Sequence, residues 1–127
     1  MEAPEQPPQL AAALDEANHR LLIGCRKPAC MLVIDTETGK VMASAPTGAG
    51  ADDMSFDAAN RRAYLSCGSG VISVVQQDDA DHYHALADIP TAPKARNSLF
   101  VPELKRFYLA VPAQKSAGTE LRVYEAR

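Results

Sequence analysis

Three stretches of the chain are copies of one another: ALDEANHRLLIGC (residues 13–25), SFDAANRRAYLSC (55–67) and LFVPELKRFYLAV (99–111). The first two align at an offset of 42 residues, and the identical positions in the first copy are Asp15, Ala17, Asn18, Arg20 and Cys25. The third copy follows the second at an offset of 44, where the pairs are Phe56–Phe100, Arg62–Arg106, Tyr64–Tyr108 and Leu65–Leu109. The chain is therefore built from one unit that recurs with a period in the low forties.

Each unit has the pattern of short strands separated by turns. We expect eleven strands, at residues 10–14, 19–25, 30–35, 41–45, 53–56, 62–67, 71–76, 83–89, 98–101, 107–111 and 121–124. A period of this length made of four short strands is typical of a β-propeller blade. The prediction is an all-β protein of about three four-stranded antiparallel blades. They span about residues 10–47, 51–91 and 95–126, the third without an outer strand of its own, after an extended proline-rich arm at residues 1–9.

Three blades do not close a ring, because closed propellers have about four to eight. Two apolar blade faces would then lie in water, and such patches normally mark an interface. We therefore expect a homodimer that forms a six-bladed ring across a two-fold axis. The missing outer strand would come from residues 2–9 of the same or the partner chain by strand addition.

The repeat resembles that of the bacterial YncE-like, or YVTN-type, β-propeller superfamily. The resemblance covers about residues 10–125 and rests on ALDEANHRL (13–21), LVIDTETGKV (32–41), SFDAANRRAYLS (55–66) and SLFVPELKRFYLAVP (98–112). It implies the propeller architecture, and a binding role rather than a defined activity. This chain departs from the family in length, because members carry about twice as many blades.

Composition excludes several classes of partner. The net charge is −3 and basic residues are not clustered, so we expect no nucleic-acid partner, because phosphate binding relies on grouped positive charge. The apolar runs are too short to span a membrane, and residues 1–10 do not have the pattern of a secretory signal. We expect a cytoplasmic or periplasmic protein.

The three cysteines do not form a disulfide framework, because their number is odd. Cys25 and Cys30 flank a predicted hairpin turn, so a bridge or half of a metal site is conceivable there. No further ligands follow at zinc-like spacing. Small buried thiols are the favoured interpretation of all three, Cys67 included, and they weakly indicate a reducing compartment.

The conserved polar positions of the repeat are expected to be structural. Asp15, Asn18, Asp57 and Asn60 fall in turns, where Asp and Asn side chains bond to the local backbone. Arg20 and Arg62 are expected to form surface ion pairs with these acids. Asp35, in VIDTETG, is expected to organise a hairpin turn in the same way.

The loops that enter the inner strands give the candidate site. In GAGADD (48–53) and PKARN (93–97), Asp52 and Asp53 align with Arg96 and Asn97. This divergence inside a repeating framework predicts ligand-binding residues at the mouth of the central channel. A small polar ligand or a divalent cation such as calcium, held by Asp52 and Asp53, would fit. The alternative is loop charge in solvent with an Asp–Arg pair between blades.

No enzymatic motif is present. His82 and His84 alternate on an outer strand and are expected to face solvent, although an H-x-H pair can chelate a metal. The serines lack a nucleophile motif, and no catalytic residue or resident cofactor is expected. The leading hypothesis is a non-enzymatic propeller module for ligand binding or assembly. The alternative is a metal-assisted, lactonase-like hydrolase with its site at the channel mouth, an analogy at the level of the fold only.

Overall fold

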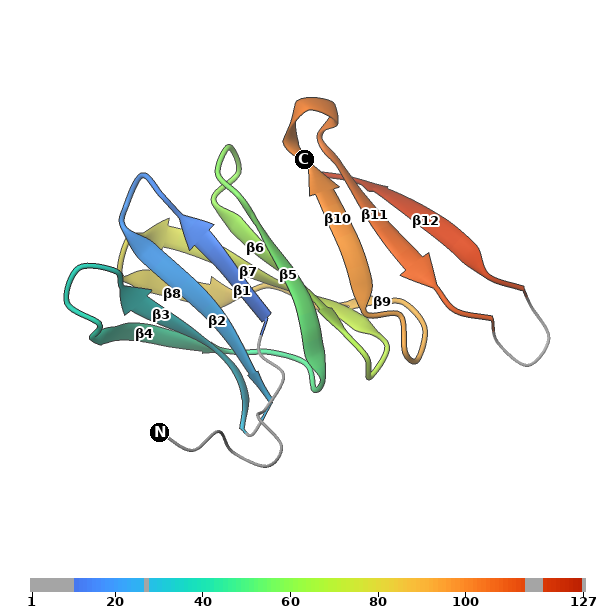
Figure 1. The fold of residues 1–127 in the computed structure, drawn as a ribbon, viewed down its shortest axis with the longest axis horizontal. Helices are drawn as coiled ribbons and strands as arrows, with labels where there is room; N and C mark the ends of the chain where they lie inside the picture. Colours follow the sequence, from blue (N-terminus) through green and yellow to red (C-terminus); the bar gives the residue numbers. More distant parts are fainter. Residues whose placement is uncertain (1–10, 27, 114–117, 127) are drawn as a thin grey trace, which may run out of the picture.

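The chain forms three antiparallel sheets, one after another along the sequence (Figure 1). The computed structural model describes residues 11–26, 28–113 and 118–126. Blade 1 contains β1 (Ala11–Asp15), β2 (Arg20–Arg26), β3 (Ala29–Asp35) and β4 (Val41–Pro46). Blade 2 contains β5 (Ala51–Asp57), β6 (Arg62–Cys67), β7 (Val71–Asp79), β8 (His82–Ala85) and the short β9 (Ile89–Pro90), which also pairs with β7. Blade 3 contains β10 (Asn97–Val101), β11 (Arg106–Val111) and β12 (Glu120–Glu125), with the 3-10 turn η1 (Pro102–Leu104) after β10.

The blades are arranged as in part of a propeller. Each sheet is a meander of sequential strands, and the first strands β1, β5 and β10 lie next to one another (Figure 1). The all-β fold predicted from the repeat is therefore confirmed. No helix in the described parts of the chain has the length and apolarity needed to cross a membrane.

Two hydrophobic cores lie between the blades rather than inside them. Leu22, Met31 and Val33 of blade 1 pack with Leu65 and Val75 of blade 2 in the first core. The second core holds Tyr64, Ile72 and Val74 of blade 2 together with Phe107, Leu109 and Val111 of blade 3. Alternate residues of one strand thus face opposite neighbours, which explains the nearly continuous apolar character of β6 and β7. Leu65 and Val74 are both buried, as the repeat predicted.

The repeated Asp–Asn turns form, and in the second of them the backbone N–H of Asn60 donates to Asp57 Oδ1 at 3.2 Å, as expected. In both turns the two side chains also bond to each other. Asn18 donates from Nδ2 to Asp15 Oδ2 at 2.8 Å, and Asn60 donates in the same way to Asp57 Oδ2 at 2.8 Å. Both carboxylates are buried. Asp15 also accepts a 2.7 Å hydrogen bond from Gln77 Nε2, so the first turn additionally links blade 1 to blade 2.

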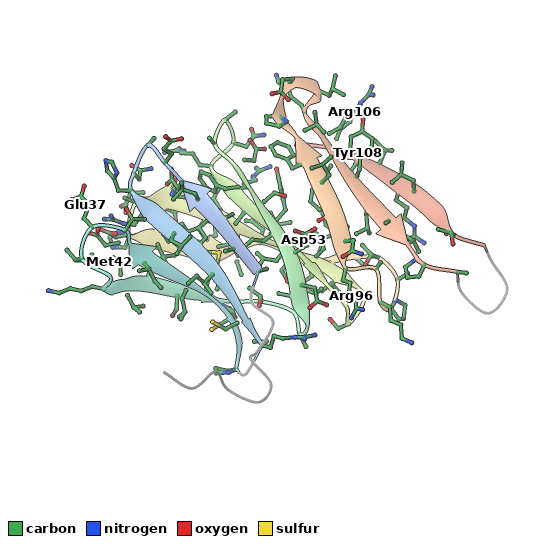
Figure 2. All side chains as sticks on the ribbon, in the orientation of Figure 1. Glu37, Met42, Asp53, Arg96, Arg106 and Tyr108 are labelled. Atoms are coloured by element: carbon green, nitrogen blue, oxygen red, sulfur yellow. The ribbon has the colours of Figure 1, made fainter. Side chains whose placement is uncertain are left out.

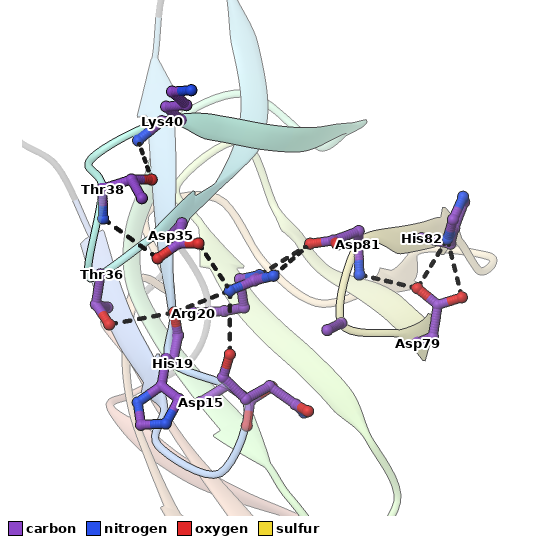
Figure 3. Close-up of polar contacts among 12 residues, drawn as sticks. Asp15, His19, Arg20, Asp35, Thr36, Thr38, Lys40, Asp79, Asp81 and His82 are labelled. Carbon is purple, nitrogen blue, oxygen red and sulfur yellow. Dashed lines mark hydrogen bonds and ion pairs between the residues drawn. The ribbon is translucent and has the colours of Figure 1, made fainter.

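The predicted partner of Arg20 is wrong. Arg20 lies 2.9 Å from Asp81 of blade 2 and 3.5 Å from Asp35 (Figure 3), whereas the Asp15 carboxylate accepts hydrogen bonds from Asn18 and Gln77. The sequence could not show this, because Asp81 is reached only when the β7–β8 turn packs beside blade 1. Arg62 donates to Gln76 Oε1 at 3.0 Å.

Asp35 organises its turn as predicted. Its Oδ1 accepts the backbone N–H groups of Glu37 and Thr38 at 2.8 and 3.3 Å, and these hydrogen bonds hold the pKa of the carboxyl below its usual value.

The predicted strand at residues 83–89 is broken into β8 and β9. Leu86 turns towards the core between blades 2 and 3, and Asp88 Oδ1 accepts a 3.1 Å hydrogen bond from Ser73 Oγ. Leu86 still donates its backbone N–H to Val74 O at 2.8 Å, and the ladder is interrupted between there and β9, so the described residues form twelve strands rather than eleven. The proposed arm at residues 1–9, and any strand it adds to β12, fall outside the described residues.

Candidate functional site

At the predicted mouth, two loops are hydrogen-bonded to one turn of blade 2. The segments 47–50 and 91–96 lead into β5 and β10 and flank the β6–β7 turn. Gly68 donates its N–H to Gly50 O at 2.9 Å, and its carbonyl accepts from Lys94 N at 2.8 Å. Gly50 has φ +76 and backbone close by, so this approach requires glycine. The loops are therefore fixed relative to each other.

Asp52 lies among these loops, at the predicted mouth. It is the extra residue where the β5–β6 register shifts, and such a bulge re-aims its side chain. Its carboxylate lies 3.4 Å from Arg26 Nη2 of blade 1 and 3.6 Å from Arg96 Nη1. The Asp52 side chain is only 8% exposed, while those of Arg26 and Arg96 are 34% and 53% exposed. Within residues 11–26, 28–113 and 118–126, neither Asp52 oxygen accepts a hydrogen bond, so these two ion pairs balance the buried charge.

The other predicted site residues have separate environments. Asp53 Oδ2 accepts the backbone N–H of Ser98 at 3.0 Å, beside a 2.7 Å hydrogen bond from Ser66 Oγ to Ser98 Oγ. Asp53 therefore connects the inner strands of blades 2 and 3. Asn97 is exposed at the start of β10. Figure 2 shows Asp53 along β5 and Arg96 at the lower end of the same region.

This geometry is that of an ionic link between blades, the alternative weighed from the sequence, although Asp52 is buried rather than solvated. Two guanidinium groups oppose a divalent cation at Asp52, and Asp53 is engaged by a backbone donor. Across the described ranges, no three His, Cys, Asp or Glu side chains are grouped to hold a metal. A calcium site at Asp52 and Asp53 remains a prediction without further support.

The two histidines of the outer strand do not form a joint site. His82 Nδ1 lies 2.7 Å from Asp79, and His84 Nδ1 lies 2.7 Å from Asp78. Both side chains are exposed, as expected. Each histidine has its own carboxylate partner, and the hydrogen bond with Asp79 raises the pKa of His82.

Arg26 was missed by the sequence argument. It is the last residue of β2, and the equivalent residue one repeat later is Gly68, which directly follows β6. The rule that singled out Asp52 and Arg96, divergence at equivalent repeat positions, would also have identified this residue. The sequence could not show that the three charged side chains meet.

The outer face of blade 3 is apolar and uncovered by the described residues. Leu99, Leu121 and Val123 are 63%, 63% and 52% exposed. The strand register places Tyr108 between Leu99 and Val123 on this face. A row of large apolar side chains across three strands exceeds the scattered apolar surface that is normal for a soluble protein.

The outer face of blade 1 is apolar in the same way. Leu22, Met31 and Val33 face blade 2, so the alternate residues of β2 and β3 face outwards. This outer face contains Leu14, Leu21, Ile23, Cys25, Cys30, Leu32, Ile34 and Val41. Leu14 and Val41 are 54% and 58% exposed. Among the described residues, the sheet at each end of the molecule therefore presents an apolar face that no other strand covers.

Comparison with solved structures identifies the architecture. One match is Kuenenia stuttgartiensis hydrazine synthase, with a TM-score of 0.76 and 15% identity over 91% of this chain and 33% of that chain. Another is a chain of the mitotic checkpoint complex, with a TM-score of 0.72 and 15% identity over 91% of this chain and 36% of that chain. Both are β-propeller proteins. The fold of this chain is part of a β-propeller.

The propeller comparison extends to the fold alone, because identity is low. The chain spans about a third of the length of the solved chains that it matches. No family model matches the sequence, and no curated protein matches it.

Proposed function

We propose that this chain is a non-enzymatic β-propeller module whose role is assembly, and that a second copy of the chain covers its end sheets. The observation that carries the proposal is the pair of apolar faces on blades 1 and 3. Uncovered apolar sheet of this kind is unfavourable in water by about 25 cal/mol for each Å². Burial of both faces supplies the driving force for association.

On the outer face of blade 3, residues pair across the strands as they do on a face of blade 2 that is buried. Val123 lies opposite Tyr108 as Val74 lies opposite Tyr64. Tyr64 and Val74 pack against the following blade. The outer face of blade 3 is thus a surface built to receive a following blade.

The blade 1 face has the complementary character. Leu21 lies opposite Ile34 as Ala63 lies opposite Val75. Ala63 and Val75 pack against the preceding blade. The molecule therefore presents one face that fits a following blade and one that fits a preceding blade, and a second copy supplies both.

Two copies satisfy both faces at once. Head-to-tail contact from blade 3 of each copy to blade 1 of the other forms two equivalent junctions, related by a two-fold axis. Three sheets from each copy give six blades, within the range of about four to eight found in closed propellers. Three copies would give nine and fall outside that range.

The experiment blocks each of the two faces in a separate variant and then mixes the variants. Leu14→Lys places a charge on the blade 1 face, and Val123→Lys places one on the blade 3 face; both positions are exposed in the single chain. Ala59→Lys, in an exposed turn of blade 2, is the matched control. Sedimentation velocity at micromolar protein reports the state of each, and circular dichroism confirms folding.

We expect dimeric wild type and Ala59→Lys, and a monomer for each face variant alone. An equal mixture of the two face variants restores part of the dimer, because one junction then joins two unmodified faces. A monomeric wild type contradicts the proposal, as would a dimer that neither lysine weakens. In the second case the chain associates through another surface.

Kinship with the YncE-like superfamily belongs to the same proposal and is supported by the repeat motifs. A small polar ligand near Arg96 and Asn97 remains a prediction, supported by their exposure at the mouth. The metal-assisted hydrolase has no specific observation in its favour, because Asp52 is paired with two arginines and Asp53 accepts a backbone N–H.

A further inference from the structure

Cys25 and Cys30 lie directly opposite each other in a regular hairpin. The β2–β3 register pairs them between Gly24–Met31 and Arg26–Ala29, without a shift. Opposite residues of antiparallel strands have Cα atoms about 4.5 to 5.5 Å apart. A disulfide needs about 4.4 to 6.8 Å. The backbone thus already holds the two cysteines at bridging distance.

The surroundings distinguish this pair from the third cysteine. Cys25 and Cys30 are half-buried, whereas Cys67 is buried. Cys67 lies opposite Val71 and has Gly48 O and Ser73 Oγ near its sulfur, at 3.7 and 3.8 Å. The expectation of small buried thiols therefore holds for Cys67, whereas Cys25 and Cys30 are free thiols that are only partly buried.

We propose that Cys25 and Cys30 form a reversible cross-strand disulfide by exchange with a small-molecule disulfide such as oxidised glutathione. One protein thiolate attacks the glutathione disulfide, forms a mixed disulfide and releases one glutathione thiolate. The second cysteine loses its proton, attacks the protein sulfur of the mixed disulfide and releases the second glutathione. Two protein thiols are oxidised to one disulfide, and one glutathione disulfide is reduced to two thiols.

Acidity sets the pH dependence of this exchange. Burial, reinforced by the neighbouring Cys30, raises the pKa of Cys25 above the usual thiol value. Arg26, the charged residue next to Cys25 in the sequence, pairs with Asp52 and lies on the opposite face of the strand. Because the thiolate is the nucleophile, the exchange is slow at neutral pH and accelerates as the pH rises.

The disulfide does not require ring closure, but ring closure would change how fast it forms. Cys67 and Val71 occupy the equivalent places of blade 2 and pack in or against the core with blade 1. A second copy on blade 1 would cover Cys25 and Cys30 in the same way. If the ring forms, exchange proceeds only through the dissociated single chain, and its rate falls as the protein concentration rises. If no ring forms, the rate does not depend on the protein concentration.

The test treats native protein with oxidised glutathione at alkaline pH and low protein concentration, then counts thiols and maps peptides by mass spectrometry. We expect the wild type to lose two of its three thiols and the mass of two hydrogen atoms, with Cys25 and Cys30 in one linked fragment. Cys67→Ala should form the same bridge. Cys30→Ser and Cys25→Ser should instead retain a bound glutathione, because the resolving thiol is missing.

Peptide mapping of the wild type keeps the test decisive if a variant fails to fold. Three unchanged thiols, stable glutathione adducts on the wild type, or a bridge to Cys67 would each overturn the proposal. A bridge that forms at one rate at all protein concentrations would support the disulfide and count against the ring. A monomer by sedimentation with a Cys25–Cys30 bridge would do the same.

Discussion

Replacement of Leu65 by alanine tests the packing of the blades. Leu65 is in the centre of β6, is 0% exposed and belongs to the core between blades 1 and 2. A Cβ built on Gly24 would lie 3.2 Å from Leu65 Cδ2. The leucine side chain thus fills the space that the glycine of the neighbouring blade leaves open.

The magnitude follows from the atoms removed and from the neighbours that remain. The substitution deletes three carbons, worth about 2.4 kcal/mol at roughly 0.8 kcal/mol each. Small neighbours such as Gly24 and Ala51 cannot expand into the cavity, although Met54 is flexible, so a cavity term of about 1 kcal/mol is added. The expected loss in the free energy of unfolding is about 3 to 4 kcal/mol, within the range of about 2 to 5 for buried leucines.

Urea denaturation at one fixed protein concentration measures this loss, because association changes apparent stability. Leu104→Ala is the control, since Leu104 is 55% exposed and should change the free energy by less than about 0.5 kcal/mol. A loss below about 1 kcal/mol for Leu65→Ala would refute the strand register.

Two further predictions concern buried polar groups. Asp52→Asn should lower the free energy of unfolding by about 1 kcal/mol, because Arg26 and Arg96 are exposed enough to turn to solvent. The double variant Arg26→Met, Arg96→Met should lower it by about 2 to 3 kcal/mol, because it leaves a buried carboxylate unpaired. Equal losses in urea titrations would contradict the ionic link. Burial and a hydrogen bond to Asp57 raise the pKa of Tyr64, so its stabilising effect is complete below the unfolded value of about 10 and is lost as the pH rises through and above it. The free energy of unfolding of Tyr64→Phe should therefore decline less with alkaline pH than that of the wild type, and parallel pH profiles would show that this tyrosine does not titrate as proposed.

The sequence predicted most of the strands because the repeat reports them directly. The strand at residues 62–67 is β6 itself, and the Asp–Asn turns recur because their hydrogen bonds are local. The break between β8 and β9 was not predictable from strand propensity. The break coincides with a long-range contact, the hydrogen bond from Ser73 to Asp88.

The candidate site was predictable only in part. Divergence between repeats pointed to Asp52 and Arg96, and the structure brings these two together. The sequence could not show that Arg26 of another blade joins them, or that Arg20 reaches Asp81 instead of Asp15. Each of these pairs joins different blades, so their partners depend on how the sheets pack and not on the local pattern.

The mass of the wild-type particle in solution is the most direct test of assembly by a second copy. Light scattering over a dilution series at micromolar concentrations should give twice 13.6 kDa, with no larger species, because the two junctions satisfy each other. A folded particle of 13.6 kDa at every concentration, or an open series of growing oligomers, would contradict the closed six-bladed ring.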